Sequence, residues 1–137
     1  MVLAAGGLLD LSLVFWTLLG GALMSGSAAA VNCVWEKKTD RLMERTKNRP
    51  VAAGRISQIN GVIFAFVIGS IALAVLALLV NPVAAALALA GHLFYVFVYT
   101  IWLKPSTPQN IVIGGAAGAV PPLVGWAAVT GEINLTA

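Results

Sequence analysis

The segment NCVWEKKTDRLMERTKNRP, from Asn32 to Pro50, is a charged island in a chain that is otherwise almost free of charge. It holds six of the eight lysines and arginines, although 60% of all residues are hydrophobic and only 9% are charged. Soluble domains carry roughly 25% charged residues, so lipid is the expected solvent for most of this chain. Because the positive charge is confined to one segment, the net charge of +3 does not indicate a nucleic-acid-binding protein.

The apolar runs on both sides of the island are long enough for membrane helices, which need about 20 residues each. Ser57 is placed to cap the second helix, Asn81-Pro82 predicts a turn after it, and Pro121-Pro122 predicts a kink in the fourth. The chain is therefore predicted to be all-α, a single polytopic transmembrane bundle of residues 1–137. Its four spanning helices are expected at about Leu11–Val31, Gln58–Val80, Val83–Leu103 and Ile111–Val129.

The charged island also predicts how the chain lies in the membrane. Lysine and arginine are enriched in cytoplasmic loops, so residues 32–57, the charged motif and its loop, are expected in the cytoplasm. After two further spans, the second polar loop, residues 104–110, returns to the same side. We expect a multi-pass protein of the cell inner (plasma) membrane with both loops cytoplasmic.

Three oxygen-bearing side chains of the island, Asn32, Glu36 and Asp40, are spaced four residues apart and share one face of a helix. Carboxylate and amide oxygens are ligands that Mg²⁺ accepts, often together with substrate phosphates. A neighbouring line of cations at the same spacing would suit a diphosphate: Lys37, Arg41, Arg45 and Arg49. A solvated, salt-bridged helix face gives the same pattern, and basic residues there can simply set topology, so spacing alone leaves these interpretations open.

The island and the second half of the chain resemble one family of membrane enzymes. N-x-x-x-E-x-x-x-D followed by RLMERTKNRPVAAGRIS resembles the first aspartate-rich motif of the UbiA superfamily of intramembrane prenyltransferases, with Glu36 where that family usually has aspartate. FYVFVYTIWLKPSTPQNIVIGGAAGAVPPLVGWAAVTG, Phe94 to Gly131, resembles the later helices of its protoheme IX farnesyltransferase (heme O synthase) branch. The resemblance covers nearly the whole chain.

This resemblance implies an enzyme that transfers the farnesyl group of farnesyl diphosphate to a vinyl group of heme B to give heme O, for heme A and terminal oxidase biogenesis. It implies Mg²⁺ as cofactor, with Asn32, Glu36 and Asp40 as the catalytic metal ligands. The implied partners are farnesyl diphosphate, heme B, membrane lipid, and heme A synthase or terminal oxidase assembly proteins. The residues implied to bind the diphosphate are Arg45, Lys47, Arg49, Tyr99 and Lys104.

The family also carries a second aspartate-rich motif on a later cytoplasmic loop, and these 137 residues contain no counterpart of it. We therefore expect an internal fragment or truncated gene product that covers the family's second to fifth helices and is inactive alone. Two other functions stay open. One is prenyl transfer to another acceptor, such as a quinone precursor or chlorophyllide, and the other is a non-catalytic four-helix membrane protein.

Two further features lie within the predicted helices. His92 is an ionisable residue inside the third span, where such groups are candidates for function. Heme ligation and an imidazole bonded to a helix carbonyl both remain open for it. Small residues at fourfold spacing are expected to let helices pack closely: Gly21, Ser25 and Ala29 on the first helix, and Gly114 and Gly118 on the fourth.

Overall fold

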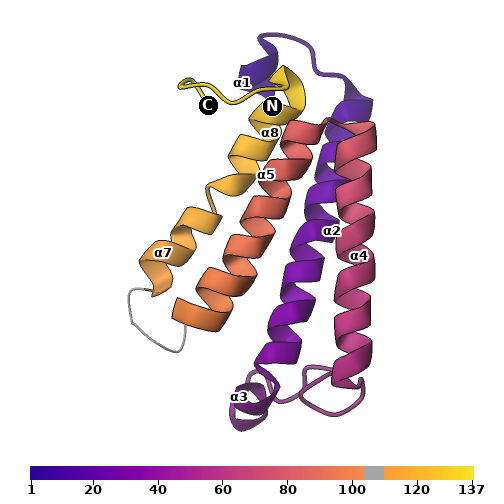
Figure 1. The fold of residues 1–137 in the computed structure, drawn as a ribbon, viewed down its shortest axis with the longest axis vertical. Coiled ribbons are helices and arrows are strands. Elements are labelled where there is room, and N and C mark those ends of the chain that lie inside the picture. The colour runs from indigo at the N-terminus through magenta and orange to yellow at the C-terminus, as the bar shows by residue number, and fades with distance from the viewer. Residues whose placement is uncertain (104–109) are drawn as a thin grey trace.

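The computed structural model describes residues 1–103 and 110–137, and every regular element in that part is a helix. The long helices run alongside one another, with the charged loop at one end and both termini at the other (Figure 1). The predicted all-α bundle is confirmed. Its elements are α1 (Val2–Ala5), α2 (Leu11–Trp35), α3 (Lys37–Leu42), α4 (Gln58–Leu79), α5 (Pro82–Leu93), the π-helix η1 (Phe94–Leu103), α7 (Asn110–Ala117) and α8 (Val120–Thr130).

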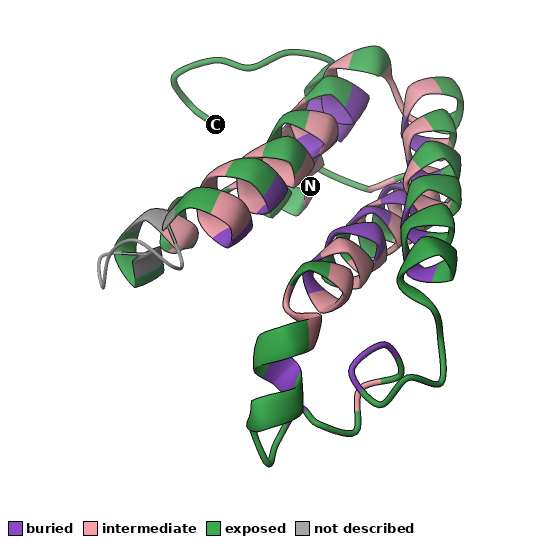
Figure 2. Ribbon diagram, turned by 60° about the horizontal axis from the view of Figure 1, so that its bottom comes forward, coloured by how far each residue is buried: buried purple, intermediate pink, exposed green. Residues whose placement is uncertain are grey.

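In the described part, three helices are long and apolar enough to cross a membrane: Leu11–Trp35, Gln58–Leu79 and Pro82–Trp102. The third combines α5 with η1, which follows it without a break. Exposed residues cover much of the surface of these helices, including large apolar side chains such as Phe64 and Phe66 on α4 (Figure 2). Apolar surface of this extent marks a membrane protein, in agreement with the first three predicted spans.

The fourth predicted span is not one continuous helix. α7 ends at Ala117 and α8 begins at Val120, so the predicted interruption of the span Ile111–Val129 is present. It lies just before Pro121-Pro122 and not at them, because both prolines lie in the first turn of α8. The N–H groups of a first turn have no acceptor within the helix, so proline loses no hydrogen bond there. The prolines therefore begin a helix and do not bend one.

Polar side chains at the helix ends fix the turns that the sequence predicted. The Ser57 hydroxyl accepts a hydrogen bond from the Asn60 N–H at 3.1 Å, which confirms the cap of α4. Asn81 Oδ1 accepts from the Ala84 N–H at 2.8 Å and so caps α5. Its Nδ2 donates to the carbonyl of Ala127 at 2.7 Å. The turn between α4 and α5 is thereby attached to α8.

The helices α2 and α4 pack closely because small residues meet at their interface. A Cβ added to Gly20 would lie 2.6 Å from Leu76, and one added to Gly61 would lie 2.6 Å from Val34. Ser27 Oγ donates to the Ala65 carbonyl at 2.8 Å across the same interface. The buried core that continues from here into α5 and α8 consists mostly of alanine: Met24, Ala72, Leu76, Ala84, Ala85, Ala88, Val124, Ala127 and Ala128.

The fourfold stripe of small residues on α2 does not take part in this packing. A Cβ on Gly21 would meet no atom within 4 Å, and Gly21, Ser25 and Ala29 all line a cavity instead. The predicted helix packing is therefore wrong for this stripe. It is confirmed for Gly114, where a Cβ would lie 2.6 Å from the ring of Tyr99 in η1.

Candidate active site

The first two oxygen-bearing residues of the charged island lie where α2 ends. The helix is interrupted at Glu36, whose backbone has φ −85° and ψ 7°. The fourfold spacing survives this interruption, because the Glu36 N–H still donates to the Asn32 carbonyl at 2.9 Å and the Asp40 N–H to the Glu36 carbonyl at 2.8 Å. Asn32 Nδ2 donates to Glu36 Oε2 at 2.9 Å, so the side chains of these two residues are in direct contact.

Arg49 joins the third residue to this pair. Its Nη1 donates to Asp40 Oδ2 at 2.9 Å and lies 3.9 Å from Glu36 Oε2. The side chain of Asp40 is only 4% exposed and that of Glu36 15%, whereas Arg49 is 36% exposed. Two largely buried carboxylates therefore share one guanidinium. We call Asn32, Glu36, Asp40 and Arg49 the carboxylate cluster.

The charge of Arg49 is stable in this position. Burial by itself lowers the pKa of Arg49, but its hydrogen bond to Asp40 and the negative charges around it raise that pKa above the ordinary arginine value. A raised pKa means that Arg49 stays protonated until strongly alkaline pH, where its own contribution to stability would be lost. Arg49 is thus positively charged throughout the physiological range.

The loop after α3 folds back to bring Arg49 to the carboxylates. Thr46, which is buried, donates its hydroxyl to the Asp40 carbonyl at 3.0 Å, and Arg41 Nε donates to the Ala52 carbonyl at 2.7 Å. α3 has already ended at Leu42, and the next residue is extended. The predicted helical line of cations through Lys37, Arg41, Arg45 and Arg49 is therefore wrong beyond Arg41, because loop contacts replace the helix after Leu42.

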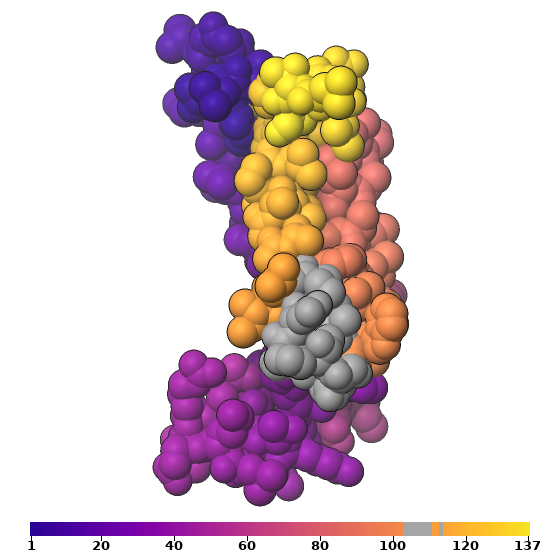
Figure 3. All heavy atoms as spheres, turned by 90° about the vertical axis from the view of Figure 1, so that its left-hand side faces the viewer, coloured from indigo at the N-terminus to yellow at the C-terminus, as the bar shows by residue number. Residues whose placement is uncertain are grey.

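The other residues predicted to bind the diphosphate lie on the charged loop, in η1 and outside the described residues. Arg45 and Lys47 are exposed on the same loop, and Lys47 Nζ lies 2.6 Å from Glu44 Oε2. In Figure 3 this loop forms a protruding mass at one end of the bundle. Tyr99 lies in η1 with its ring centroid 5.2 Å from that of Tyr95. Lys104 lies outside the described residues.

The donor set of the cluster fits a hard divalent cation. Asn32 Oδ1 is buried and accepts no hydrogen bond from any described residue, although buried polar atoms are normally paired. Two carboxylates and this amide oxygen could hold Mg²⁺, which commonly completes its shell with water and substrate phosphate. Among the described residues no three His, Cys, Asp or Glu side chains gather closely enough to hold a metal. A cation here would therefore depend on the amide oxygen and on ligands from a substrate.

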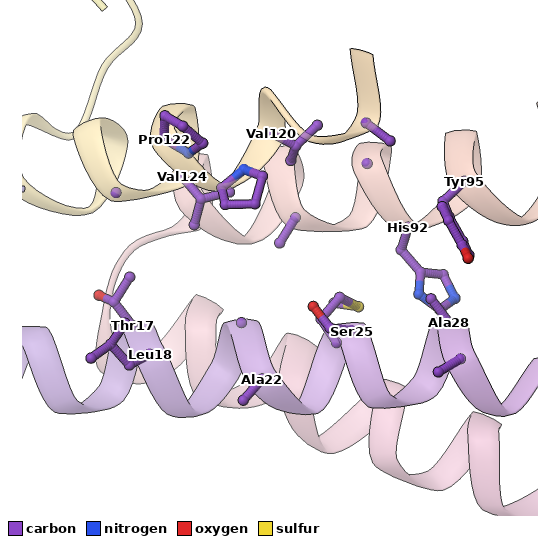
Figure 4. Close-up of a pocket in the computed structure, with 18 of the residues that line it drawn as sticks. Thr17, Leu18, Ala22, Ser25, Ala28, His92, Tyr95, Val120, Pro122 and Val124 are labelled. Carbon is purple, nitrogen blue, oxygen red and sulfur yellow. The ribbon is translucent and has the colours of Figure 1, made fainter. Parts of the chain in front are cut away.

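A cavity of about 640 Å³ lies between α2, α5 and α8 (Figure 4). This volume lies within the roughly 300–1,000 Å³ of small-molecule sites. Ala28, which lines it, precedes Asn32 by one helical turn on the same face of α2, so the cavity wall leads to the cluster. Most residues that line it are small or apolar, such as Gly21, Ala28 and Val124. Ser25, His92 and Tyr95 add polar groups to the lining.

The residues of α2 that line this cavity are the part of the site that sequence reasoning missed. The signal was present, since Gly21, Ser25 and Ala29 lie on one face of α2. Small residues mark either a close helix contact or a wall with free space beside it, and only the position of the neighbouring helices separates the two. On α2, the neighbouring face with Gly20 and Ser27 meets α4.

Comparisons with known proteins give consistent results. The UbiA prenyltransferase family matches residues 1–137. The protoheme IX farnesyltransferase of Trichodesmium erythraeum (strain IMS101) is 52% identical over 137 residues, which cover 100% of this chain and 42% of that protein. That of Clavibacter michiganensis subsp. michiganensis (strain NCPPB 382) is 51% identical over 134 residues, or 98% of this chain and 44% of that protein. The chain thus spans less than half the length of these relatives. No solved structure matches it.

The ion pair at the centre of the cluster predicts a stability effect. Arg49→Met leaves the buried Asp40 carboxylate without its donor and should lower the free energy of unfolding by about 1–3 kcal/mol. Arg45→Met removes an exposed arginine from the same loop and should change it by no more than about 0.5 kcal/mol. Unfolding in detergent micelles, followed by circular dichroism, measures both. Equal stability of the two variants would contradict the assigned role of Arg49.

Proposed function

The chain belongs to the UbiA prenyltransferase family, and on that premise we propose that it takes part in transferring the farnesyl group of farnesyl diphosphate to a vinyl group of heme B. The product is heme O, which would pass to heme A synthase or terminal oxidase assembly proteins. The observation that carries the proposal is the carboxylate cluster at the end of α2, the helix that also lines an apolar cavity. The names of the relatives support heme as the acceptor.

Each residue of the cluster has a part in binding the diphosphate. Asn32, Glu36 and Asp40 would hold Mg²⁺, which when bound neutralises charge that develops on the leaving diphosphate. Arg49 already lies beside both carboxylates and would turn its guanidinium towards phosphate oxygens, which its planar fork suits. Further cations would come from Arg45 and Lys47, which are exposed on the loop, and from Lys104, which lies outside the described residues. We assign Tyr99 of η1 to the same binding role as a neutral hydrogen-bonding group.

The proposed reaction is an alkyl transfer without redox change. The bond between C1 of the farnesyl chain and the diphosphate oxygen breaks, and diphosphate leaves with the electron pair. C1 then bonds to the outer carbon of the vinyl group, and water adds its oxygen to the inner carbon with release of one proton. The cavity would keep other water away from C1 because its lining residues, apart from Thr17, Ser25, His92 and Tyr95, carry no polar side chain.

We further propose that the charged loop faces the cytoplasm, because it is rich in lysine and arginine beside two membrane helices. Arg45→Cys in a Cys33→Ser background gives one exposed thiol on this loop. A membrane-impermeant maleimide should label it in inside-out vesicles and not in right-side-out ones. The opposite result would place the loop on the other side and contradict the assignment.

A chimera tests the proposed function directly. In the Trichodesmium erythraeum relative, the 137 matching residues are replaced by this chain, and the hemes of membranes that lack another source of heme O are analysed by mass spectrometry. We expect heme O from the chimera. Asp40→Ala should reduce it by about 100-fold or more, the size of effect seen when one charge-stabilising group is removed.

Glu44→Ala is the matched control for that experiment. Glu44 is an acidic residue of the same loop, but its side chain is 90% exposed and paired with Lys47. This variant should retain heme O formation. A chimera that makes no heme O while the parent relative does, or one that stays active with Asp40→Ala, would contradict the proposal.

A further inference from the structure

The chain's only histidine lies in the middle of a membrane span, and no described residue forms a hydrogen bond with its side chain. His92 lies near the midpoint of the Pro82–Trp102 span, where an ionisable side chain is costly unless it has a function. Its Nδ1 is fully buried, and neither ring nitrogen makes a hydrogen bond within residues 1–103 and 110–137. Buried polar groups are normally satisfied, so this imidazole lacks the partner that a purely structural role would give it.

The ring of His92 borders the cavity between α2, α5 and α8. In Figure 4 it extends from α5 towards α2 at the level of Ala28, and both residues line the cavity. The wall of α2 opposite consists of small residues, including Gly21 and Ser25, so space for a ligand remains in front of the ring. Apart from His92, no acidic or basic side chain belongs to the lining formed by the described residues. Any ligand held here is therefore mostly apolar.

The residues around His92 restrict which kind of ligand it could bind. A free metal ion needs several protein ligands, and the described residues provide no group of three His, Cys, Asp or Glu side chains. A metal that arrives with its own ligands needs only one more. Iron in a porphyrin has four ring nitrogens and takes an axial ligand, most often histidine. Porphyrin is also largely apolar, in agreement with the cavity lining.

We propose that a ring nitrogen of His92 binds the iron of heme B and so positions the acceptor for transfer. This inference rests on the proposed function, and it makes His92 the residue that separates heme from acceptors without iron. The level of His92, near Ala28, is one helical turn from Asn32, or about 6 Å along α2. A porphyrin centred there would extend towards the carboxylate cluster, where C1 of the farnesyl chain is bound.

The local backbone also changes at this point. The α-helix gives way to the π-helix η1 two residues after His92, and the Phe94 N–H is shared between the carbonyls of Ala90 and Gly91. Wide helical turns of this kind occur frequently at functional sites. The change in helix type alters the direction of the residues that follow, including Tyr95, which lines the same cavity.

Heme titration of the 137-residue chain in detergent micelles tests the proposal. The unchanged chain should bind heme B with the absorption spectrum of histidine-ligated iron. His92→Gly should lose that spectrum and bind heme roughly 10- to 100-fold more weakly, as for loss of a group that supports a metal. Free imidazole added to His92→Gly should restore the spectrum. Such a rescue would show that the variant is folded and that its cavity is intact. His92→Leu serves as a second variant that suits a membrane helix.

Trp126→Phe is the matched control. Trp126 Nε1 is also buried without a hydrogen-bond partner among the described residues, but Trp126 does not line the cavity. Its replacement should leave heme affinity and spectrum unchanged. Failure of the unchanged chain to bind heme, or an unchanged spectrum and affinity in both His92 variants, would overturn the proposal.

The experiments distinguish failure of heme ligation by His92 from failure of the proposed function. If the chimera loses heme O formation with Asp40→Ala but keeps it with His92→Gly, and the heme spectra do not depend on His92, the transfer reaction stands and the ligation fails. If the unchanged chimera makes no heme O, the proposed function fails whatever the heme spectra show.

Discussion

The contact of Arg49 with Asp40 and Glu36 is the interaction on which the candidate site depends. Two carboxylates this close and this little exposed repel each other unless a cation lies between them. Arg49 supplies that cation, and the hydrogen bonds of Thr46 and Arg41 hold the loop that presents it. The same negative groups would hold Mg²⁺ under a diphosphate. Under the proposed function, the loop conformation and the binding of substrate would be coupled through one set of charges.

Helix α2 connects this cluster to the rest of the molecule. One face, with Gly20 and Ser27, packs on α4, and another, with Gly21 and Ser25, lines the cavity. Its last turn carries Asn32, so the apolar cavity and the polar cluster share one rigid element. An acceptor in the cavity and a diphosphate at the cluster would thus be held at a fixed separation, which is what a transfer reaction requires.

The sequence predicted those features that depend on local chemistry. Long apolar runs define the three spans, Ser57 caps α4, Asn81-Pro82 marks the turn before α5, and fourfold spacing places Asn32 beside Glu36. Features that depend on contacts distant in sequence were not predicted. α3 ends at Leu42, and beyond it the Thr46 hydroxyl donates to the Asp40 carbonyl. The spacing of Arg41 and Arg49 does not show that a loop replaces the helix between them.

The most direct test of the central claim is the Mg²⁺ dependence of farnesyl diphosphate binding to this chain in detergent micelles. We predict binding that is roughly tenfold or more tighter with Mg²⁺, a difference of about 1.4 kcal/mol. Asp40→Asn, which keeps the shape of the side chain and removes its charge, should abolish that difference. Equal affinity with and without Mg²⁺ in the unchanged chain, or full Mg²⁺ dependence in Asp40→Asn, would contradict the account.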